Sequence, residues 1–389
     1  MLLQAIIATA ATFIAMVVNY LFHFAMTKML SPEVYGELSI LIALYSYIMM
    51  PATVLQVFFT REMSKSKKDL FKGYLKFSLL LGLFFSTILF FSSTIISSAI
   101  KDKEMLLPIR LISIAIPFAF ILSSIRSYYQ SKENAYLLSA LIIADPLIKI
   151  ASALLLVYYG FGLIGATIGI AIPSLILNLI FSKLYFRKGS SEFDLSILKP
   201  ITLILLIQVM LAFIFYIDLF FVRYYLGPEQ TGYYNAVSIT SKVIAYSIGG
   251  ISIVTYPKYA KADMKKDMKK VKNIMLKSVL FILPIFFVFI LMPEFIIKML
   301  YTERYVVAKD AFVVLCFGML LNTIFRITMD FMISQKMEKN VLFIAIIAVI
   351  VDIVLMNVFI PSKGLIGAAL ATTLTSAVML LLGLVAVKI

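Results

Sequence analysis

Few residues of this 389-residue chain can carry the chemistry that soluble enzymes commonly use. It has one cysteine and one histidine, Cys316 and His23. This excludes an intramolecular disulfide, leaves too few ligands for a Cys- or His-based metal site, and argues against a Ser-His-Asp triad. It has no tryptophan, and no G-x-x-x-x-G-K-[ST] phosphate-binding motif occurs. We therefore expect no cofactor, no metal and no catalysed reaction.

Charge is also scarce, because only 14% of the residues are charged, whereas 62% are hydrophobic. Soluble domains are about 45–50% apolar and about 25% charged, and a soluble fold has too little interior to hide the excess. Twelve apolar runs instead have the length of membrane spans. They lie near residues 2–27, 38–60, 77–100, 109–127, 135–159, 163–184, 201–222, 233–257, 278–299, 311–330, 341–360 and 365–387. The sequence predicts an all-α polytopic membrane protein with twelve transmembrane helices, located in the cell membrane.

The net charge of +15 would suggest nucleic-acid binding in a soluble protein. Here most of the Lys and Arg residues fall in the segments that follow even-numbered spans. Basic residues accumulate on the cytoplasmic side of membrane proteins, so this distribution places both termini in the cytoplasm. No charged side chain precedes Lys28, and we read the first apolar run as an uncleaved span. The excess charge is thus a topology signal, and no nucleic-acid partner is expected.

Three short motifs recur in the two halves of the chain in the same order. L-x-P-E-x-x-G occurs at 30–36 and 226–232, K-K-D at 67–69 and 265–267, and G-L-I-G-A at 162–166 and 364–368. Each repeat would hold six spans, and an even number makes the repeats parallel, related by a pseudo-two-fold axis along the membrane normal. We therefore predict an N-terminal lobe at 1–188, a cytoplasmic linker at 189–200 and a C-terminal lobe at 201–389. Rocking of two such lobes around a central cavity gives alternating access.

Two segments carry a family resemblance. LSPEVYGEL at 30–38 and IDLFFVRYYLGPEQTGYYNA at 217–236 resemble the polysaccharide-exporter flippases. These belong to the superfamily of multidrug, oligosaccharidyl-lipid and polysaccharide exporters (the MOP superfamily), which also contains the MATE drug exporters and the lipid II flippase. The resemblance implies transfer of a polyprenyl-diphosphate-linked oligosaccharide from the inner to the outer leaflet. It also implies membrane lipids, and glycosyltransferases or a polymerase of the same pathway, as partners.

Charged side chains inside a membrane are costly, so each one needs a reason. Lys149 lies near the middle of span 5 with Asp145 one turn before it, and Lys242 lies in span 8 with no acid one turn away. Two readings of the first pair stay open, a self-neutralising helical pair or two groups that face the cavity. For Lys242, Asp218 in span 7 is a plausible partner, and Asp352 in span 11 corresponds by the repeat to Asp145.

The candidate site follows from the chemistry of a sugar diphosphate. Candidates for binding the diphosphate are the basic residues Lys149, Lys242, Arg126 and Arg326. The two arginines lie near cytoplasmic span ends, where snorkelling to the surface is the simpler reading. Candidates for ion coupling or charge pairing are Asp145, Asp218 and Asp352. Candidate sugar contacts are Asn19, Asn178, Gln208 and Asn322.

Two other functions remain open. A MATE-type exporter of organic cations predicts a cavity dominated by carboxylates, and the three intramembrane aspartates against two lysines do not decide between the two transporters. A membrane-embedded polysaccharide polymerase would need a sizeable outer loop, and the predicted outer loops are short. The two resembling segments favour the flippase.

Overall fold

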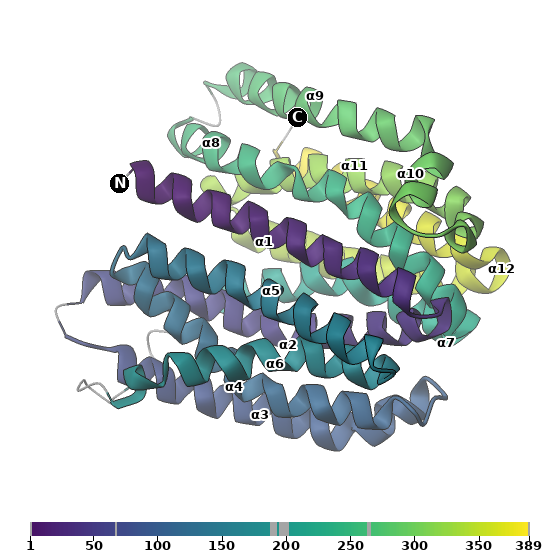
Figure 1. The fold of residues 1–389 in the computed structure, drawn as a ribbon. Helices are drawn as coiled ribbons and strands as arrows, with labels where there is room; N and C mark the ends of the chain where they lie inside the picture. Colours follow the sequence, from purple (N-terminus) through teal and green to yellow (C-terminus); the bar gives the residue numbers. More distant parts are fainter. Residues whose placement is uncertain (1, 67, 187–192, 194–201, 263–265, 388–389) are drawn as a thin grey trace. The chain divides into compact units, whose positions relative to one another are not determined.

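The computed structural model describes residues 2–66, 68–186, 193, 202–262 and 266–387, and these are helical with short connections (Figure 1). In chain order the α-helices are α1 (Leu2–Met29), α2 (Pro32–Lys65), α3 (Phe71–Ala99), α4 (Leu106–Ser131), α5 (Ala135–Tyr158), α6 (Gly162–Ile180), α7 (Thr202–Tyr246), α8 (Ile248–Lys261), α9 (Met268–Leu291), α10 (Pro293–Leu300), α11 (Lys309–Ser334) and α12 (Glu338–Val387). Two short 3₁₀ helices, η1 (Ser182–Phe186) and η3 (Glu303–Ala308), complete the described part. This part of the chain contains no strand, as the sequence predicts.

Ten of the described helices are long and apolar enough to cross a membrane. Two of these, α7 with 45 residues and α12 with 50, are far longer than the roughly 20 residues that a bilayer requires. Each is interrupted by one non-helical glycine, Gly227 in α7 and Gly364 in α12. Each therefore supplies two crossing segments, which gives the twelve spans that the sequence predicts.

The chain divides into two compact units, residues 1–205 and 206–389. Each unit contains six crossing segments: α1 to α6 in the first, and the halves of α7 and α12 together with α9 and α11 in the second. Of the predicted linker at 189–200, only Phe193 lies within the described residues. The predicted lobe boundaries, the pseudo-two-fold axis and the membrane orientation stay predictions.

Helix α4 is the centre of the first unit. It packs against α2, α3, α5 and α6, while α1 packs on α5 at the edge of the unit (Figure 1). Small residues allow the closest approaches: a β-carbon at Gly82 of α3 would lie 2.7 Å from the Cα of Pro117 in α4. Small residues of this kind let membrane helices pack backbone to backbone.

Helix α11 takes the same place in the second unit. It packs against α8, α9, α10, α12 and the 3₁₀ helix η3. Gly318 of α11 meets Thr373 of α12, where an added β-carbon would lie 2.6 Å from the Thr373 hydroxyl. By the sequence repeat α4 and α11 are equivalent, so the two units share a packing plan as well as a motif order.

The repeated motifs occupy equivalent positions in the helices. Pro32 opens α2 after the N-cap Ser31, and Pro228 follows the break at Gly227, where φ is 85°. The glycines that begin the two G-L-I-G-A motifs, Gly162 and Gly364, have φ values of 48° and 59°. These left-handed conformations are strained for residues with a β-carbon and allow the tight reversal between spans.

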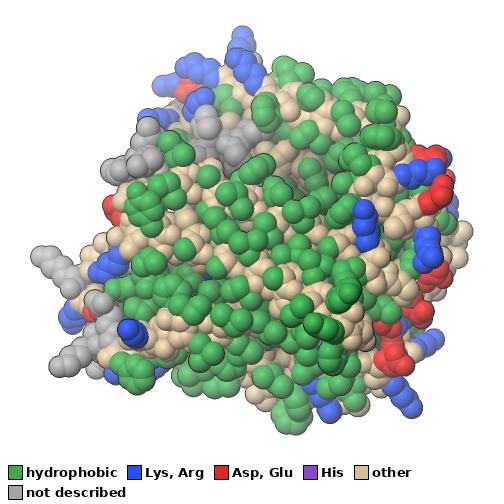
Figure 2. Space-filling model, viewed as in Figure 1, with side chains coloured by type: hydrophobic (Ala, Val, Ile, Leu, Met, Phe, Trp, Pro, Cys, Tyr) green, Lys and Arg blue, Asp and Glu red, His purple; other side chains and the backbone are tan. Residues whose placement is uncertain are grey.

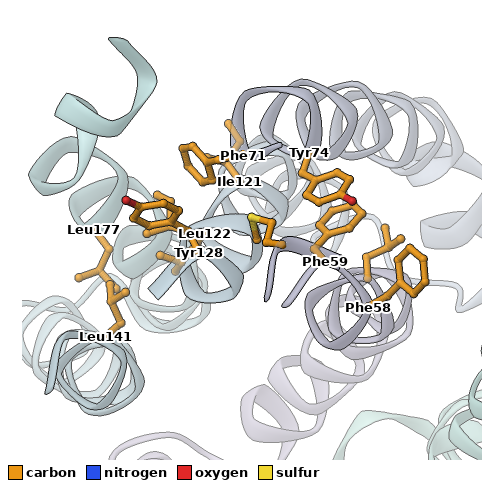
Figure 3. Close-up of a cluster of buried hydrophobic side chains, with 12 residues drawn as sticks. Phe58, Phe59, Phe71, Tyr74, Ile121, Leu122, Tyr128, Leu141 and Leu177 are labelled. Carbon is orange, nitrogen blue, oxygen red and sulfur yellow. The ribbon is translucent and has the colours of Figure 1, made fainter. Parts of the chain in front are cut away.

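A cluster of buried aromatic and aliphatic side chains from α2, α3, α4, α5 and α6 lies inside the first unit (Figure 3). Phe59 of α2 stacks on Tyr74 of α3 with ring centroids 4.2 Å apart, and Phe71 contacts Tyr128 of α4. Phe193 stacks on Phe77 at 4.1 Å, so one residue of the connecting segment is held against α3. This cluster joins the end of α2, the beginning of α3 and the end of α4.

Apolar side chains lie on the outer surface of the helices as well as in the interior. On the visible face, hydrophobic side chains cover the middle of the helices, and charged side chains gather near helix ends (Figure 2). Phe91, Leu179 and Leu291 are each 74% exposed. Apolar surface of this extent is normal only against lipid, because soluble monomers rarely expose large contiguous apolar patches.

Candidate functional site

In the first unit, Arg126 and Asp145 form an ion pair inside the helix bundle. The Arg126 Nη2 atom of α4 donates to the Asp145 Oδ2 atom of α5 over 2.5 Å. The side chains are 21% and 35% exposed, and Tyr45 of α2 interacts electrostatically with both. The Arg126 Nε atom is buried without a hydrogen-bond partner among the described residues. Charged donors therefore remain on Arg126 beyond those that Asp145 uses.

Lys149 is held by neutral groups. Its ammonium donates a hydrogen bond to the Asn19 Oδ1 atom of α1 and lies 4.6 Å from the centre of the Phe22 ring. Asn19 in turn donates to the Ala15 carbonyl over 2.9 Å. Both partners orient the positive charge without cancelling it, since an amide and an aromatic face are neutral.

The reading of Asp145 and Lys149 as a self-neutralising pair finds no support. Asp145 forms its described ion pair with Arg126 on another helix, and Lys149 interacts with Asp145 only electrostatically. Pro146 lies between them and is buried. The first unit thus brings together Arg126, Asp145 and Lys149, three of the predicted site residues, and the side chain of Asn19, a fourth.

In the second unit, two carboxylates lie in one buried polar cluster. Tyr234 donates to the Asp218 Oδ2 atom over 3.0 Å, and Thr375 donates to the Asp352 Oδ1 atom over 2.9 Å. Asp218 and Asp352 are 1% and 0% exposed and interact electrostatically. Tyr234 also makes a side-chain hydrogen bond with Thr372, which lies one turn before Thr375 on α12. The cluster draws one residue or more from each half of α7 and of α12.

Lys242 is a basic group that acts on this cluster. It is 2% exposed, donates to the Phe215 carbonyl over 2.7 Å and lies over the rings of Phe215 and Tyr216. It interacts electrostatically with Asp218, as the sequence suggested, but forms no ion pair with it in the described part of the chain. Lys242 interacts with Asp218, whereas no basic group among the residues that the structure describes is found to act on Asp352, so an ionised Asp352 would be a buried negative charge without a cation beside it.

The buried negative charge would be neutralised at Asp352. Its Oδ2 atom is buried and has no hydrogen-bond partner among the described residues. A buried, unpaired carboxylate oxygen is costly, and a proton or a bound cation removes the cost. The cluster around Asp218 and Asp352 can therefore take up positive charge.

Other predicted residues serve different roles. The Asn178 amide donates to the Phe118 and Ser174 carbonyls and accepts from Tyr185, so it joins α4, α6 and η1. Gln208 is exposed, and Asn322 is 7% exposed. Arg326 interacts electrostatically with Asp330 one turn later on α11. None of these is joined to the two clusters by a described hydrogen bond.

Charged groups outside the spans behave differently. In α10, Lys298 donates to Glu294 over 3.0 Å and to Glu303 over 3.1 Å. These hydrogen bonds hold the pKa of the Glu294 carboxyl below its usual range and raise the pKa of Lys298. The side chains are solvated, so the network contributes little to stability. A substitution in this network can therefore serve as a control for substitutions of the intramembrane charges.

Sequence reasoning did not single out Tyr45, Phe22 or Thr375 as site residues. Tyr234 stands in the segment that carries the family resemblance, although no role was assigned to it. Its hydroxyl and that of Thr375 are matched to carboxylates on other spans, which sequence spacing does not reveal. The sequence could indicate only that each intramembrane aspartate needs a hydrogen-bond donor from a neighbouring span.

An all-helical chain with twelve crossing segments in two units of six has the architecture of a polytopic membrane protein. Solved structures agree. The chain superposes on an inward-facing multidrug resistance MATE transporter of the MOP superfamily with a TM-score of 0.81 at 13% identity, covering 97% of this chain and 98% of that one. It superposes on the lipid II flippase MurJ, inward closed, with a TM-score of 0.80 at 17% identity, covering 99% and 88%. A MOP superfamily transporter from Pyrococcus furiosus gives 0.62 at 16% identity, covering 99% and 95%.

The family follows from the sequence itself. A model of the polysaccharide biosynthesis protein family matches residues 25–310, and the chain belongs to this family. No curated protein matches the sequence at a significant level. The resemblance predicted from the two loop segments is thus confirmed at the level of the family.

Proposed function

We propose that this protein is a flippase that moves a polyprenyl-diphosphate-linked oligosaccharide from the inner to the outer leaflet for assembly of a surface polysaccharide. The observation that carries the proposal is the accessible positive charge of the first unit. Arg126 has one carboxylate partner and keeps further donors, and Lys149 is held by an amide and a ring. A diphosphate is a matching ligand, because guanidinium and ammonium groups bind phosphate oxygens through charge-assisted hydrogen bonds.

Membership of a polysaccharide biosynthesis family supports this substrate class. A sugar diphosphate cannot cross hydrocarbon without replacing its hydration, and polar side chains within the spans provide the replacement. Asn19, beside Lys149, supplies an amide of the kind that binds hydroxyl groups. The polyprenyl chain would stay in lipid. No bond of the substrate is made or broken, so the activity is transport and not catalysis.

The buried cluster of the second unit suits a different task. Asp218 and Asp352 are almost fully buried, so they are less suited than Arg126 and Lys149 to meeting a large headgroup. Uptake of a proton or a cation at this cluster would change the local charge and so bias one conformation over another. We propose this cluster as the coupling site of the transporter.

The test is a transport assay in proteoliposomes that carry a fluorescent polyprenyl-diphosphate-linked oligosaccharide. Each loss of a charged hydrogen bond is worth about 1.5–3 kcal/mol, or roughly 10- to 100-fold. Lys149→Ala and Arg126→Gln should each slow transport by about that factor, and Lys298→Ala, which removes an exposed cation of α10, should not. Unchanged transport in both intramembrane variants would remove these residues from the substrate path.

A second function has support from the carboxylates. A MATE-type exporter of organic cations would use Asp145, Asp218 or Asp352 to bind a positive substrate. The same proteoliposomes, loaded with ethidium or tetraphenylphosphonium, distinguish the two. Transport of the organic cation that is lost in Asp145→Asn but kept in Lys149→Ala would favour the exporter.

A further inference from the structure

Arg110 is a charged residue of α4 that the transport function does not use. Its Nε atom donates to the Ser93 hydroxyl of α3 over 3.2 Å, and its guanidinium lies 5.1 Å from the centre of the Phe90 ring. Among the residues that the structure describes, no carboxylate lies within ion-pair distance of it. The positive charge is therefore oriented by two groups of α3 without being neutralised.

The surroundings of Arg110 face lipid. Leu107 and Ile114, three residues before it and four after it, share its face of α4 and are 51% and 54% exposed. On α3, Phe91 and Ile95 are also strongly exposed. Arg110 itself is only half-buried. A guanidinium on an apolar outer face needs an anion from outside the protein, because an unpaired charge beside hydrocarbon is costly.

Arg110 lies near the start of α4 and is the second residue of the span predicted at 109–127, which puts it near the membrane surface. Helix α4 begins at Leu106, four residues earlier, and α3 ends at Ala99, six residues after Ser93. At 1.5 Å per residue, the pair lies about 6–9 Å inside the helix ends. Headgroups occupy roughly 5–8 Å on each side of the hydrocarbon core. The phosphate of a phospholipid therefore reaches the level of Arg110.

Two other cations near helix ends show what plain snorkelling looks like. Lys28 lies over Phe24, and Lys363 over Phe359, each on its own helix and one turn away. Neither is held by a hydrogen bond from a second helix in the described residues. Arg110 differs because Ser93, which is buried, fixes its Nε atom and leaves four N–H donors on the terminal nitrogens.

We propose that Arg110 and Ser93 form a binding site for the phosphate of a membrane phospholipid at the surface where α3 ends and α4 begins. The terminal nitrogens of Arg110 bind two phosphate oxygens, and the acyl chains lie along Leu107, Ile114, Phe91 and Ile95. In the predicted topology this is the outer surface. The lysines of the connection between α3 and α4, Lys101 and Lys103, are balanced by Asp102 and Glu104, so Arg110 supplies the net positive charge here, and an anionic headgroup binds more tightly than a zwitterionic one.

The experiment measures the thermal unfolding of the purified full chain in detergent micelles doped with one lipid at a time. Phosphatidylglycerol should raise the unfolding temperature most, phosphatidylcholine less, and diacylglycerol, which has no phosphate, not at all. Inorganic phosphate at the same concentration should have no effect, because it lacks the apolar part of the ligand. Stabilisation by inorganic phosphate equal to that by phosphatidylglycerol would overturn the lipid assignment.

Variants locate the effect. Arg110→Gln should weaken phosphatidylglycerol binding roughly tenfold, as expected for one lost charged hydrogen-bonding group. Ser93→Ala keeps the charge and should weaken phosphatidylglycerol binding less than Arg110→Gln does. Arg110→Lys should weaken it to an extent between those two variants, and Lys363→Ala should bind like the wild type. Native mass spectrometry of the same samples counts retained lipid, which separates lost binding from lost stability. Equal lipid retention in Arg110→Gln and the wild type would overturn the proposal.

Discussion

The two units use one helix order to hold charges in opposite ways. Asp145 in α5 and Asp352 in the first half of α12 correspond by the repeat, yet their surroundings differ. The Asp145 side chain is 35% exposed and paired with Arg126, whereas Asp352 is fully buried and has one unpartnered oxygen. A shared fold therefore does not imply a shared role for equivalent residues.

The difference shows which unit can meet a large ligand. Partly exposed groups such as Arg126 can exchange one partner for another, since water or ligand can reach them. Fully buried groups such as Asp218 and Asp352 exchange only small species, a proton or a cation, unless the helices move apart. We infer that the first unit provides the binding charges and the second provides the response to an ion.

The largest effect should come from neutralising Asp352. Asp352→Asn removes the carboxylate that can take up positive charge, so an imposed proton or sodium gradient should no longer drive transport. Couplings of this kind are worth about 1–3 kcal/mol, so gradient stimulation should fall about 5- to 150-fold. The measurement is the ratio of initial rates with and without the gradient in proteoliposomes.

A matched control sits at the exposed beginning of α11. Asp310→Asn removes an acid from the same unit without entering the buried cluster and should leave the ratio unchanged. Binding of the substrate headgroup should persist in Asp352→Asn, because the proposed diphosphate contacts lie in the first unit. Full gradient stimulation in Asp352→Asn would refute the division of roles.

A second comparison concerns the tight turns of the repeat. A β-carbon at Gly367 would lie 2.0 Å from the Phe359 carbonyl oxygen, whereas one at the equivalent Gly165 would lie 2.9 Å from the Leu156 β-carbon. Both positions are crowded, but the contact at Gly367 is much the shorter and is with backbone, so Gly367→Ala should lower the free energy of unfolding by about 1–3 kcal/mol. Gly165→Ala should cost clearly less.

Denaturation of the detergent-solubilised variants, followed by circular dichroism, checks this order. The substitutions add the same methyl group at repeat-equivalent positions, so each is the control of the other. Equal losses in the two variants would mean that both turns relax to the same extent, contrary to the static distances.

The fold was predictable because membrane spans depend on local composition. The apolar runs and the repeated glycines and prolines located twelve spans, and Gly162 and Gly364, which begin the same motif in the two units, both have a positive φ. Helix ends were not predictable: α2 begins at Pro32 and continues to Lys65, well beyond the apolar run at 38–60. Helices extend past the bilayer when their polar ends pack or cap, as at Ser31, and hydropathy does not record this.

The charged residues inside the membrane were predictable from the sequence, and their pairings were not. An intramembrane charge is visible in the sequence, so Arg126, Asp145 and Lys149 were found, and the structure brings them together. The sequence favoured no partner for Arg126, because its carboxylate lies on the next helix, 19 positions later. Asn178 looked like a sugar contact, yet its amide is used up by helix packing, which depends on orientation and not on composition.

The smallest effect should come from the ion pair of the first unit. Asp145→Asn frees Arg126 from its carboxylate partner while keeping an amide that can still accept a hydrogen bond. A partly exposed pair contributes about 0.5–1 kcal/mol after solvent screening, so diphosphate binding should tighten about two- to fivefold. Equilibrium binding of a lipid diphosphate to the purified protein measures this.

The sign of that change separates two roles for Asp145. If the carboxylate only fixes the Arg126 side chain, its loss lets the guanidinium adopt several positions, and diphosphate binding becomes weaker. If Asp145 competes with the substrate for Arg126, its loss strengthens binding and slows release, because the carboxylate no longer helps to displace the phosphate. Tighter binding with slower transport would thus identify Asp145 as the group that returns Arg126 to its unloaded state, a role different from the one proposed for its buried counterpart Asp352.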